Sequence, residues 1–384
     1  MEETMKIYRL KIKIISPVHV GTGEVYEPTN FFVHAKEKYL GIIDFERFCH
    51  LISNSDLDRF TKLCREGTIN ALVRLYDFMD SKCLALVGQG IDGFIIRKIA
   101  LCNGFLRHYE RLKSLSGDKL QREFNRFTIY RNAFSPNSNQ PILPGSAIKG
   151  AIRTAVLNLR RQKAKGSSWK DYCQGKKCDS KQLESDILEY PKFKFQNDPF
   201  RLLKISDFSP VGKVDAKVMY AVNYKKQGFR ARGPYQIFEV IEPGAVFEGK
   251  ITLLEPQRNS GIRTPLSFDE ILQALEDFYG KEKARESDEI RGIGADFPTL
   301  PQDGFPLCLG RHSGAECVTV KGFRRIKIMG PGRQAKFFDH ATTLWLVSDE
   351  PRPQDVSRLK PFGWAVILGV SDEDPSHPHR RRVL

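Results

Sequence analysis

A short segment, residues 144–154, combines residue types that together hold a phosphate group. Pro144 disfavours helix, and a Gly-Ser pair follows at the point where a helical pattern begins. Unpaired N–H groups at a helix start attract anions, and Lys149 and Arg153 lie on one stripe of the expected helix. The chemistry that this pattern predicts is non-covalent phosphate binding. The candidate contacts are Gly145, Ser146, Lys149 and Arg153.

The same segment has an alternative interpretation as an ordinary amphipathic helix with a solvated basic face. Its apolar side is formed by Ala147, Ile148, Ala151, Ile152, Ala155, Val156 and Leu159. We expect Ser146 to cap the first turn. Gly150 costs about 1 kcal/mol relative to alanine inside a helix, which suggests close approach by another backbone. No Gly-Lys-Ser/Thr follows a four-residue gap, so the segment is not a nucleotide-hydrolysing P-loop.

The overall charge favours a polyanionic partner. The chain has 384 residues, with 61 Lys and Arg against 46 Asp and Glu, which gives a net charge of +15. An excess of this size favours nucleic acid, with a membrane surface as the alternative. No apolar run approaches the ~18 residues of a spanning helix, and no basic signal peptide is evident. We expect a cytoplasmic protein without a membrane partner.

Three further stretches are candidate phosphate contacts. Gly21, Thr22 and Gly23 follow a strand pattern, and a simple turn explains them equally well. Residues 224–235 interleave cations with aromatic side chains, which suits phosphates and unpaired bases; a solvated basic loop is the alternative. The candidates there are Lys225, Lys226, Arg230 and Arg232. Near the C-terminus they are Arg311, Ser313, Gly314, Lys321 and Arg324, followed by Gly330 and Gly332.

Metal and cofactor sites are not indicated. Eight cysteines are scattered along the chain without a Cys-x-x-Cys pair, so we expect free thiols and neither a metal nor a cofactor. They are Cys49, Cys64, Cys83, Cys102, Cys173, Cys178, Cys308 and Cys317.

Catalytic groups are sparse. The sequence shows no Ser-His-Asp set and no carboxylate cluster for two metals, and helix capping explains Asp44. Single histidines are more often structural than catalytic, yet they leave histidine-dependent RNA cleavage as an alternative. The candidates are His19, His34, His50 and His312. We expect no enzyme activity from this chain on its own.

Periodicity predicts an α+β protein with antiparallel sheets. Expected strands cover 6–15, 94–101, 200–208, 217–224, 344–347 and 364–369, with hairpins at 30–43 and 237–254. Expected helices cover 45–52, 57–79, 106–115 and a segment opened by a Ser267 capping box.

Two β-β-α-like cycles, separated by a polar stretch, suggest two ferredoxin-like (RRM-like) modules. The expected division is an N-terminal module at 1–161 with a helical insertion, a polar basic surface insertion or linker at 162–200, a C-terminal module at 201–370, and a frayed basic tail at 371–384.

Four ordered motifs resemble one protein family. Residues 15–23 (ISPVHVGTG) and 142–153 (ILPGSAIKGAIR) look like signatures of the RAMP proteins of CRISPR systems. Residues 310–314 (GRHSG) and 360–364 (KPFGW) follow. The order and the chain length resemble the family of fifth Csm subunits in type III-A effector complexes.

The resemblance implies RRM-like folds and a place at the end of a ribonucleoprotein filament. The implied partners are the 3′ part of CRISPR RNA, target single-stranded RNA and neighbouring Csm backbone subunits, with a recruited trimming nuclease as a further candidate. The implied role is to cap the guide 3′ end and to support guide maturation, assembly and target binding. The alternatives are a metal-independent endoribonuclease acting on CRISPR RNA precursors and a purely protein-binding scaffold.

Overall fold

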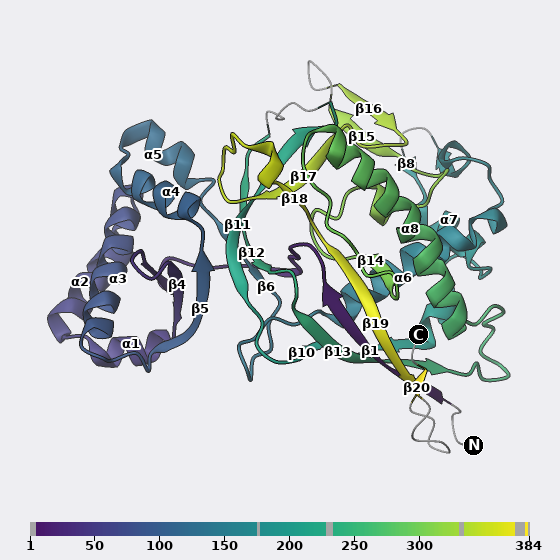
Figure 1. Ribbon diagram of the computed structural model, residues 1–384, viewed down its shortest axis with the longest axis horizontal. Coiled ribbons are helices and arrows are strands. Elements are labelled where there is room, and N and C mark those ends of the chain that lie inside the picture. Colours follow the sequence, from purple (N-terminus) through teal and green to yellow (C-terminus); the bar gives the residue numbers. More distant parts are fainter. Residues whose placement is uncertain (1–4, 175–176, 228–232, 330–333, 373–380, 383–384) are drawn as a thin grey trace.

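The structure is a computed structural model that describes residues 5–174, 177–227, 233–329, 334–372 and 381–382. Two large sheets form its centre (Figure 1). Helices α6 and α8 cover one sheet, while α1 to α5 gather around the far end of the other. The predicted α+β class with mainly antiparallel sheets is confirmed, and the division into two ferredoxin-like modules stays a prediction.

The first sheet, sheet A, has seven strands in the order β10-β13-β1-β19-β14, with β9 on β13 and β20 on β19. β1 is antiparallel to both β13 and β19, so the N-terminal strand lies in the middle of the sheet. The strands are β1 (Met5–Ile14), β9 (Leu203–Ile205), β10 (Ser209–Pro210), β13 (Val246–Leu254), β14 (Phe305–Cys308), β19 (Trp364–Asp372) and β20 (Arg381–Arg382).

The second sheet, sheet B, has nine strands in the order β2-β6-β12-β11-β5-β4-β3, with β17 on β11 and β18 on β17. Only the β5–β11 and β6–β12 pairs are parallel among the described strands. The strands are β2 (Gly21–Val25), β3 (Phe31–His34), β4 (Tyr39–Ile43), β5 (Ile95–Leu101), β6 (Ile129–Asn132), β11 (Ala216–Lys225), β12 (Gln236–Ile241), β17 (Thr343–Ser348) and β18 (Lys360–Pro361). Two small hairpins complete the strands: β7 (Cys173–Gln174) with β8 (Lys177–Cys178), and β15 (Ile326–Met329) with β16 (Ala335–Phe338).

Two of the helices begin where the sequence predicts caps. Asp44 accepts the amide of Arg47 at the start of α1, and Ser267 accepts the amide of Glu270 at the start of α8. The helices are α1 (Phe45–Leu51), α2 (Asn54–Glu66), α3 (Ile69–Gly88), α4 (Asn103–Ser114), α5 (Gly117–Phe124), α6 (Gly145–Leu159), α7 (Ser180–Ile187) and α8 (Phe268–Gly292). None of the helices in the described ranges is both long and apolar enough to cross a bilayer.

The main core lies between sheet A and the helix pair α6 and α8. Alternating residues of β1, including Leu10, Ile12 and Ile14, meet Ile148 and Ile152 of α6 in one buried cluster. The apolar helical face predicted for residues 147–159 is therefore confirmed on the element that carries the glycine motif.

The β3–β4 hairpin separates two smaller cores. Because side chains alternate across a strand, Phe32 joins a cluster with Phe48 and Met79, while Phe31 and Val33 join the cluster beneath α4 and α5. The predicted hairpin at 30–43 is confirmed by the pairing of β3 with β4.

Three element predictions are wrong in detail. The hairpin expected at 237–254 does not form, because β12 pairs within sheet B and β13 within sheet A. The turn between them carries the chain from one sheet to the other. The helix expected at 57–79 is two helices, α2 and α3, since Gly67 adopts a left-handed conformation at the end of α2. Residues 200–208 contribute only the short strand β9.

Two expectations for residues 162–200 are also wrong. Cys173 and Cys178 face each other across the β7–β8 hairpin and form a disulfide, so not all eight thiols are free. Ile187 and Leu188 are buried in the main core, so the segment is not a surface excursion along its whole length. Both large sheets contain strands from either side of this segment. The predicted domain boundaries therefore do not coincide with the sheets, and they stay a prediction.

Candidate RNA-binding surface

The start of α6 is closed by the chain itself. The Gly145 amide donates to Asp207 Oδ1 at 2.8 Å, so a carboxylate lies where the sequence predicts a phosphate. A Cβ at Gly145 would lie 2.4 Å from the Ile205 carbonyl oxygen, which explains the glycine by close approach of β9. Ser146 is exposed but does not cap the helix, contrary to expectation, because Pro144 is the cap residue. The close contact expected at Gly150 is absent: nothing lies within 4 Å of its added Cβ position.

The two cations of this motif have internal partners. Lys149 Nζ donates to the Leu203 carbonyl at 2.7 Å, and partial burial lowers the pKa of this lysine. Arg153 pairs with Glu184 at 2.7 Å and with Asp198 at 2.9 Å. The motif thus links α6 to β9, to α7 through Glu184, and to the segment after α7 through Asp198. RNA contact by Gly145, Ser146, Lys149 and Arg153 stays a prediction.

The other three motifs converge at the junction of the two sheets. The Gly363 amide donates to the Pro17 carbonyl at 2.9 Å, and the Leu309 amide donates to the Gly363 carbonyl at 2.8 Å. The Arg311 amide donates to the His19 carbonyl at 2.8 Å. Segments almost 350 residues apart in the chain therefore form one hydrogen-bonded unit.

Gly310 makes this convergence possible. Its φ of +82° is a conformation that side chains disfavour, and an added Cβ would lie 2.2 Å from the His19 carbonyl oxygen. The backbone of the 310–314 loop can therefore approach residue 19 only with glycine at this position. Ser313 is buried and donates to the Gly310 carbonyl at 2.7 Å, while Gly314 has a φ of +84°. These two residues shape the loop.

A surface of exposed and half-buried residues adjoins this junction. Gly21, Thr22 and Gly23 are exposed on β2, which pairs with β6. The Arg311 guanidinium is 4.9 Å from the ring centre of Tyr130 on β6. The adjacent Arg131 guanidinium lies 3.3 Å from the ring centre of Phe134. We call these residues the Arg311 surface: Gly21, Thr22, Gly23, Tyr130, Arg131, Phe134 and Arg311.

Sequence reasoning found the glycines and Arg311 of this surface but missed Tyr130, Arg131 and Phe134. The signal that was available is the run Tyr-Arg-Asn-Ala-Phe, which interleaves a cation with two aromatic side chains just before the 142–153 motif. A guanidinium held flat on a ring can bind a phosphate at its edge, while an exposed glycine strand allows a nucleic-acid backbone to approach the main chain.

The two histidines at the junction are neutral, with His19 buried and His312 half-buried. His19 is 2% exposed, and its Nδ1 donates to the Glu239 carbonyl at 2.8 Å. Burial and the nearby Arg311 charge lower the pKa of His19 to about 3 and that of His312 to about 3. His312 stacks on Trp345. Neither histidine is therefore protonated near neutral pH.

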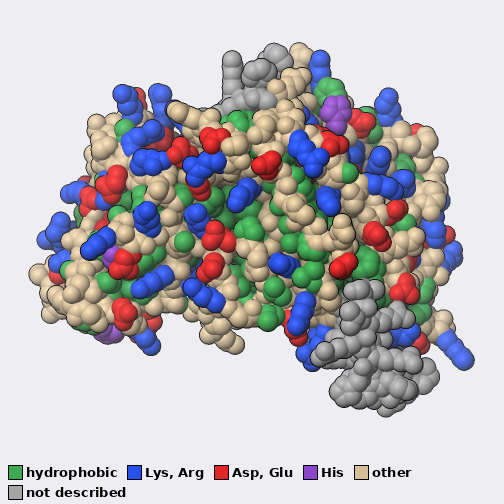
Figure 2. Space-filling view, viewed as in Figure 1, with side chains coloured by type: hydrophobic (Ala, Val, Ile, Leu, Met, Phe, Trp, Pro, Cys, Tyr) green, Lys and Arg blue, Asp and Glu red, His purple; other side chains and the backbone are tan. Residues whose placement is uncertain are grey.

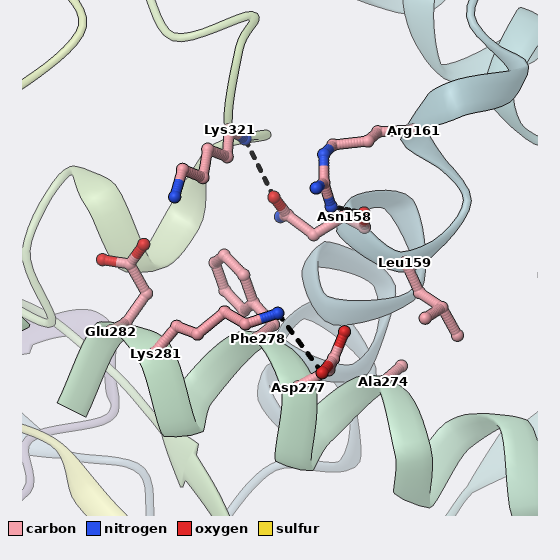
Figure 3. A pocket seen from close by; sticks show the side chains of 9 residues that line it. All are labelled: Asn158, Leu159, Arg161, Ala274, Asp277, Phe278, Lys281, Glu282 and Lys321. Carbon is pink, nitrogen blue, oxygen red and sulfur yellow. Dashed lines mark hydrogen bonds and ion pairs between the residues drawn. The ribbon is translucent and has the colours of Figure 1, made fainter. Parts of the chain in front are cut away.

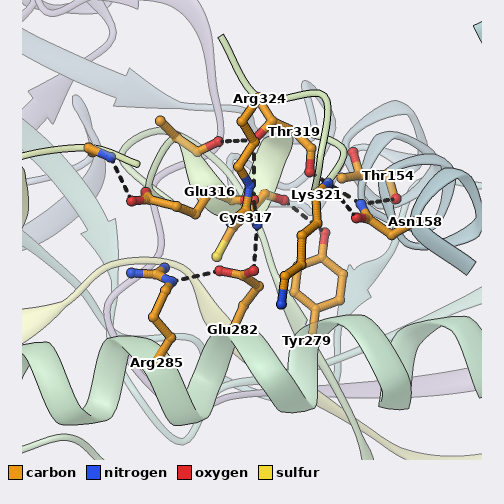
Figure 4. Close-up of polar contacts among 12 residues, drawn as sticks. Thr154, Asn158, Tyr279, Glu282, Arg285, Glu316, Cys317, Thr319, Lys321 and Arg324 are labelled. Carbon is orange, nitrogen blue, oxygen red and sulfur yellow. Dashed lines mark hydrogen bonds and ion pairs between the residues drawn. The ribbon is translucent and has the colours of Figure 1, made fainter. Parts of the chain in front are cut away.

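The remaining predicted cations divide into exposed and braced side chains. Lys225 and Lys321 are exposed. Lys226 pairs with Glu289 at 2.6 Å and with Glu316 at 2.9 Å. Arg324 is buried against Glu282 of α8 and the Glu316 carbonyl, as Figure 4 shows. The predicted contacts Arg230, Arg232, Gly330 and Gly332 lie outside the described residues.

Lys321 also borders a small pocket between α6 and α8 (Figure 3). The pocket holds about 110 Å³, and its cations face acids such as Asp277, which pairs with Lys281 at 3.3 Å. The Lys321 amide donates to Asn158 Oδ1 at 2.8 Å. Mixed charge and small size make this a packing gap rather than a nucleic-acid groove. Figure 2 likewise shows blue and red side chains interspersed across the visible face, without one large basic patch. The described residues contain no group of three potential metal ligands.

The comparison with protein families decides the relationship. The sequence model of the RAMP superfamily matches residues 11–296. The chain belongs to the RAMP superfamily. The predicted resemblance to this family is thereby confirmed, and the matched range includes two of the four motifs.

Individual relatives of this RAMP protein agree. It is 24% identical over 327 residues to "CRISPR system Cms protein Csm5" of Streptococcus thermophilus, a match that covers 83% of this chain and 82% of that protein. Two solved structures share its fold. A chain in the cryo-EM structure of a type III-A Csm–crRNA–target RNA ternary complex has a TM-score of 0.56 at 18% identity, covering 94% of this chain and 100% of that one. The crystal structure of T. onnurineus Csm5 has a TM-score of 0.53 at 17% identity, covering 93% and 100%.

Proposed function

We propose that this RAMP protein is a non-catalytic, RNA-binding subunit of a type III-A Csm complex, and that it caps the 3′ end of the guide RNA. The observation that carries the proposal is the convergence of three motifs beneath the exposed Arg311 surface. Similarity to Csm5 proteins and to a chain in a Csm–crRNA–target RNA complex supports the assembly. In this role the protein supports guide maturation and target RNA binding beside neighbouring Csm subunits.

The Arg311 surface suits an RNA backbone better than a base-specific contact. Two guanidinium groups sit on aromatic rings beside an exposed strand that begins Gly-Thr-Gly. Such groups hold phosphates and leave the bases free, which is what a subunit that binds guides of many sequences requires. A recruited trimming nuclease remains part of the proposal without a residue assigned to it.

The first prediction tests this surface. Arg311→Ala should weaken binding of single-stranded RNA by roughly tenfold and lower the slope of log affinity against log salt by about 0.7, because one phosphate contact is lost. Fluorescence anisotropy over a salt series measures both quantities. Arg59→Ala is the matched control. Arg59 is an exposed arginine on the distant helix α2, and its guanidinium lies over the ring of Phe78 on α3.

Equal losses in the two variants would show that only net charge matters. RNA crosslinking with mass spectrometry on the assembled complex then tests the 3′ placement, where peptides of the Arg311 surface should crosslink to the guide's 3′ part. Crosslinks confined to the 5′ part would refute the capping role.

The non-catalytic assignment rests on the state of the histidines. His19 is buried and His312 is half-buried, and both are hydrogen-bonded and neutral at physiological pH. Incubation of the purified protein with precursor RNA in EDTA should leave the RNA intact. Cleavage that disappears in a His19→Asn variant with an unchanged melting temperature would establish the endoribonuclease alternative instead.

A further inference from the structure

Two phenylalanines are exposed on the segment that follows α7. Phe193 is 66% exposed, the largest fraction among the large hydrophobic side chains of the described residues, and Phe195 is 50% exposed. The Lys192 ammonium lies 4.9 Å from the Phe193 ring centre, and Lys181 lies 6.0 Å from that of Phe195. Exposed rings beside cations are the pattern of surfaces that stack unpaired bases.

The backbone holds Phe193 outward at an energetic cost. The Lys194 amide donates to the Pro191 carbonyl at 3.0 Å, which closes a four-residue turn. Phe193 occupies the third position of that turn with a φ of +67°, where glycine or asparagine is strongly favoured. A bulky aromatic residue in this conformation costs about 1–3 kcal/mol. Solvent exposure adds no compensating burial, so the ring's presence requires another reason.

A cationic pocket is lined by Lys194, the residue between the two phenylalanines in the chain. It holds about 470 Å³, which lies within the range of about 300–1,000 Å³ typical of ligand sites. Three cations, Lys194, Arg258 and Arg263, line it without any carboxylate. No ion-pair partner contacts these three side chains in the described parts of the chain. We call this site, together with Phe193 and Phe195, the Arg258 pocket.

The pocket is fixed by the surrounding fold. Asn197 donates to the Ser260 carbonyl at 3.1 Å, which ties the two walls together. Gly261 has a φ of +66°, and an added Cβ would lie 1.9 Å from Asn197 Nδ2. Asp198, which follows Asn197 in the chain, forms an ion pair with Arg153 of α6. The walls are therefore attached to the main core.

Nearby acids do not neutralise the pocket. Asp179 pairs with Lys192, Glu189 pairs with Lys163, and Asp198 pairs with Arg153. The lining itself carries three cations and no carboxylate, which favours an anion.

We propose that the Arg258 pocket is a second site for single-stranded RNA, in which a phosphate sits among Lys194, Arg258 and Arg263 while adjacent bases stack on Phe193 and Phe195. The site shares no residue with the Arg311 surface. The proposal rests on the proposed function only in taking the bound polyanion to be RNA. A strand bound at this site would extend to the segment that follows α7.

The test separates ring stacking from folding. Phe193→Gly should raise the urea midpoint, because glycine suits the left-handed turn, yet it should weaken binding of a single-stranded RNA of about 12 nucleotides. Combined with Phe195→Ala, the loss should be at least about tenfold. Phe193→Trp should retain binding. Phe45→Ala on α1, where Phe45 is 36% exposed, is the matched control and should have no effect.

The cations give an independent readout. Arg258→Ala with Arg263→Ala should reduce the slope of log affinity against log salt by about 1.4. Ultraviolet crosslinking should label the peptide that contains Phe193 and Phe195, and the label should persist in Arg311→Ala.

Each negative result has a distinct meaning. Unchanged affinity and no label on that peptide, with the Arg311 surface still labelled, would overturn the second site and leave the proposed function standing. Absence of label on both surfaces would remove both. If Phe193→Gly instead prevents a neighbouring subunit from binding without RNA, the pocket is a protein-docking site and the proposal is wrong.

Discussion

At the level of single residues, the glycine motif of α6 depends on contacts that no local pattern reveals. Gly145, Lys149 and Arg153 match a phosphate-binding pattern, but Asp207, Leu203 and Asp198 supply their partners from 45 to 62 residues away. Sequence reasoning identified which residues are special, and only the fold shows what they contact. Arg311 illustrates the opposite case, because its exposure agrees with the predicted role.

The second prediction concerns Gly310. Gly310→Ala should destabilise the protein by at least about 2 kcal/mol, since the new methyl group meets the His19 carbonyl and the backbone is strained. Urea denaturation measures the change. Gly322→Ala is the control, because Gly322 has a similar φ of +88° but nothing within 4 Å. Equal losses would mean that backbone strain alone acts.

The third prediction concerns pH. The folded-state pKa values of His19 and His312 are about 3, whereas an unfolded histidine titrates near 6.5. The unfolded state therefore binds more protons between these values, and stability should fall as pH drops below about 6.5, by up to about 1.4 kcal/mol per pH unit for each histidine.

Glu286 opposes this trend. Burial raises the pKa of Glu286 to about 8, so its contribution to stability falls as pH rises from about 4.5 to 8. The contribution of His312 to the pH dependence of the unfolding free energy is isolated by comparing His312→Gln with the natural protein. Urea titrations at pH values over about two units, from 5 to 7, measure it. The variant should show the weaker dependence, and identical curves would show that His312 is protonated in the folded state.

At the level of elements, strands and helices were predictable because hydrophobic periodicity is local. The strand at β1, the β3–β4 hairpin and the buried face of α6 follow from residue spacing alone. Pairing was not predictable. β12 and β13 are consecutive and joined by a short turn, yet they belong to different sheets, because Val18 bridges to Ile241 where the chain crosses over.

The fourth prediction concerns α6. Gly150→Ala should stabilise the protein by about 0.5–1 kcal/mol, because Gly150 is exposed within the helix and open space surrounds its added Cβ position. Thermal denaturation measures the shift. If a neighbouring RNA or subunit requires glycine at this position, the isolated variant should be more stable but should fail to assemble into the complex.

At the level of the whole molecule, charge predicted the class of partner but not its location. The net charge is +15, but the basic side chains are interspersed with acidic ones on the face that Figure 2 shows. Many cations form internal ion pairs. Of the predicted cations in the described residues, Lys225, Arg311 and Lys321 are exposed, while Arg324 is buried. Counting charges could not separate these groups, because their partners are set by tertiary packing.

The fifth prediction concerns sheet A. A chain that ends at residue 363 lacks β19 and leaves β1 and β14 without a partner on that side, so it should fail to fold. A chain that ends at residue 372 keeps β19 and should fold. Circular dichroism and gel filtration compare the two. Cooperative unfolding of the shorter chain would contradict the central role of this strand.

The position of β1 between β13 and β19 has a consequence during synthesis. β1 precedes both of its partners in the chain, so it must wait for residues 246–254 and then 364–372 before its two edges are covered. Until residues 364–372 have been made, an amphipathic strand with an open hydrogen-bonding edge is available to other nascent chains. We therefore expect β1 to be the segment most prone to mispairing before the chain is complete through β19.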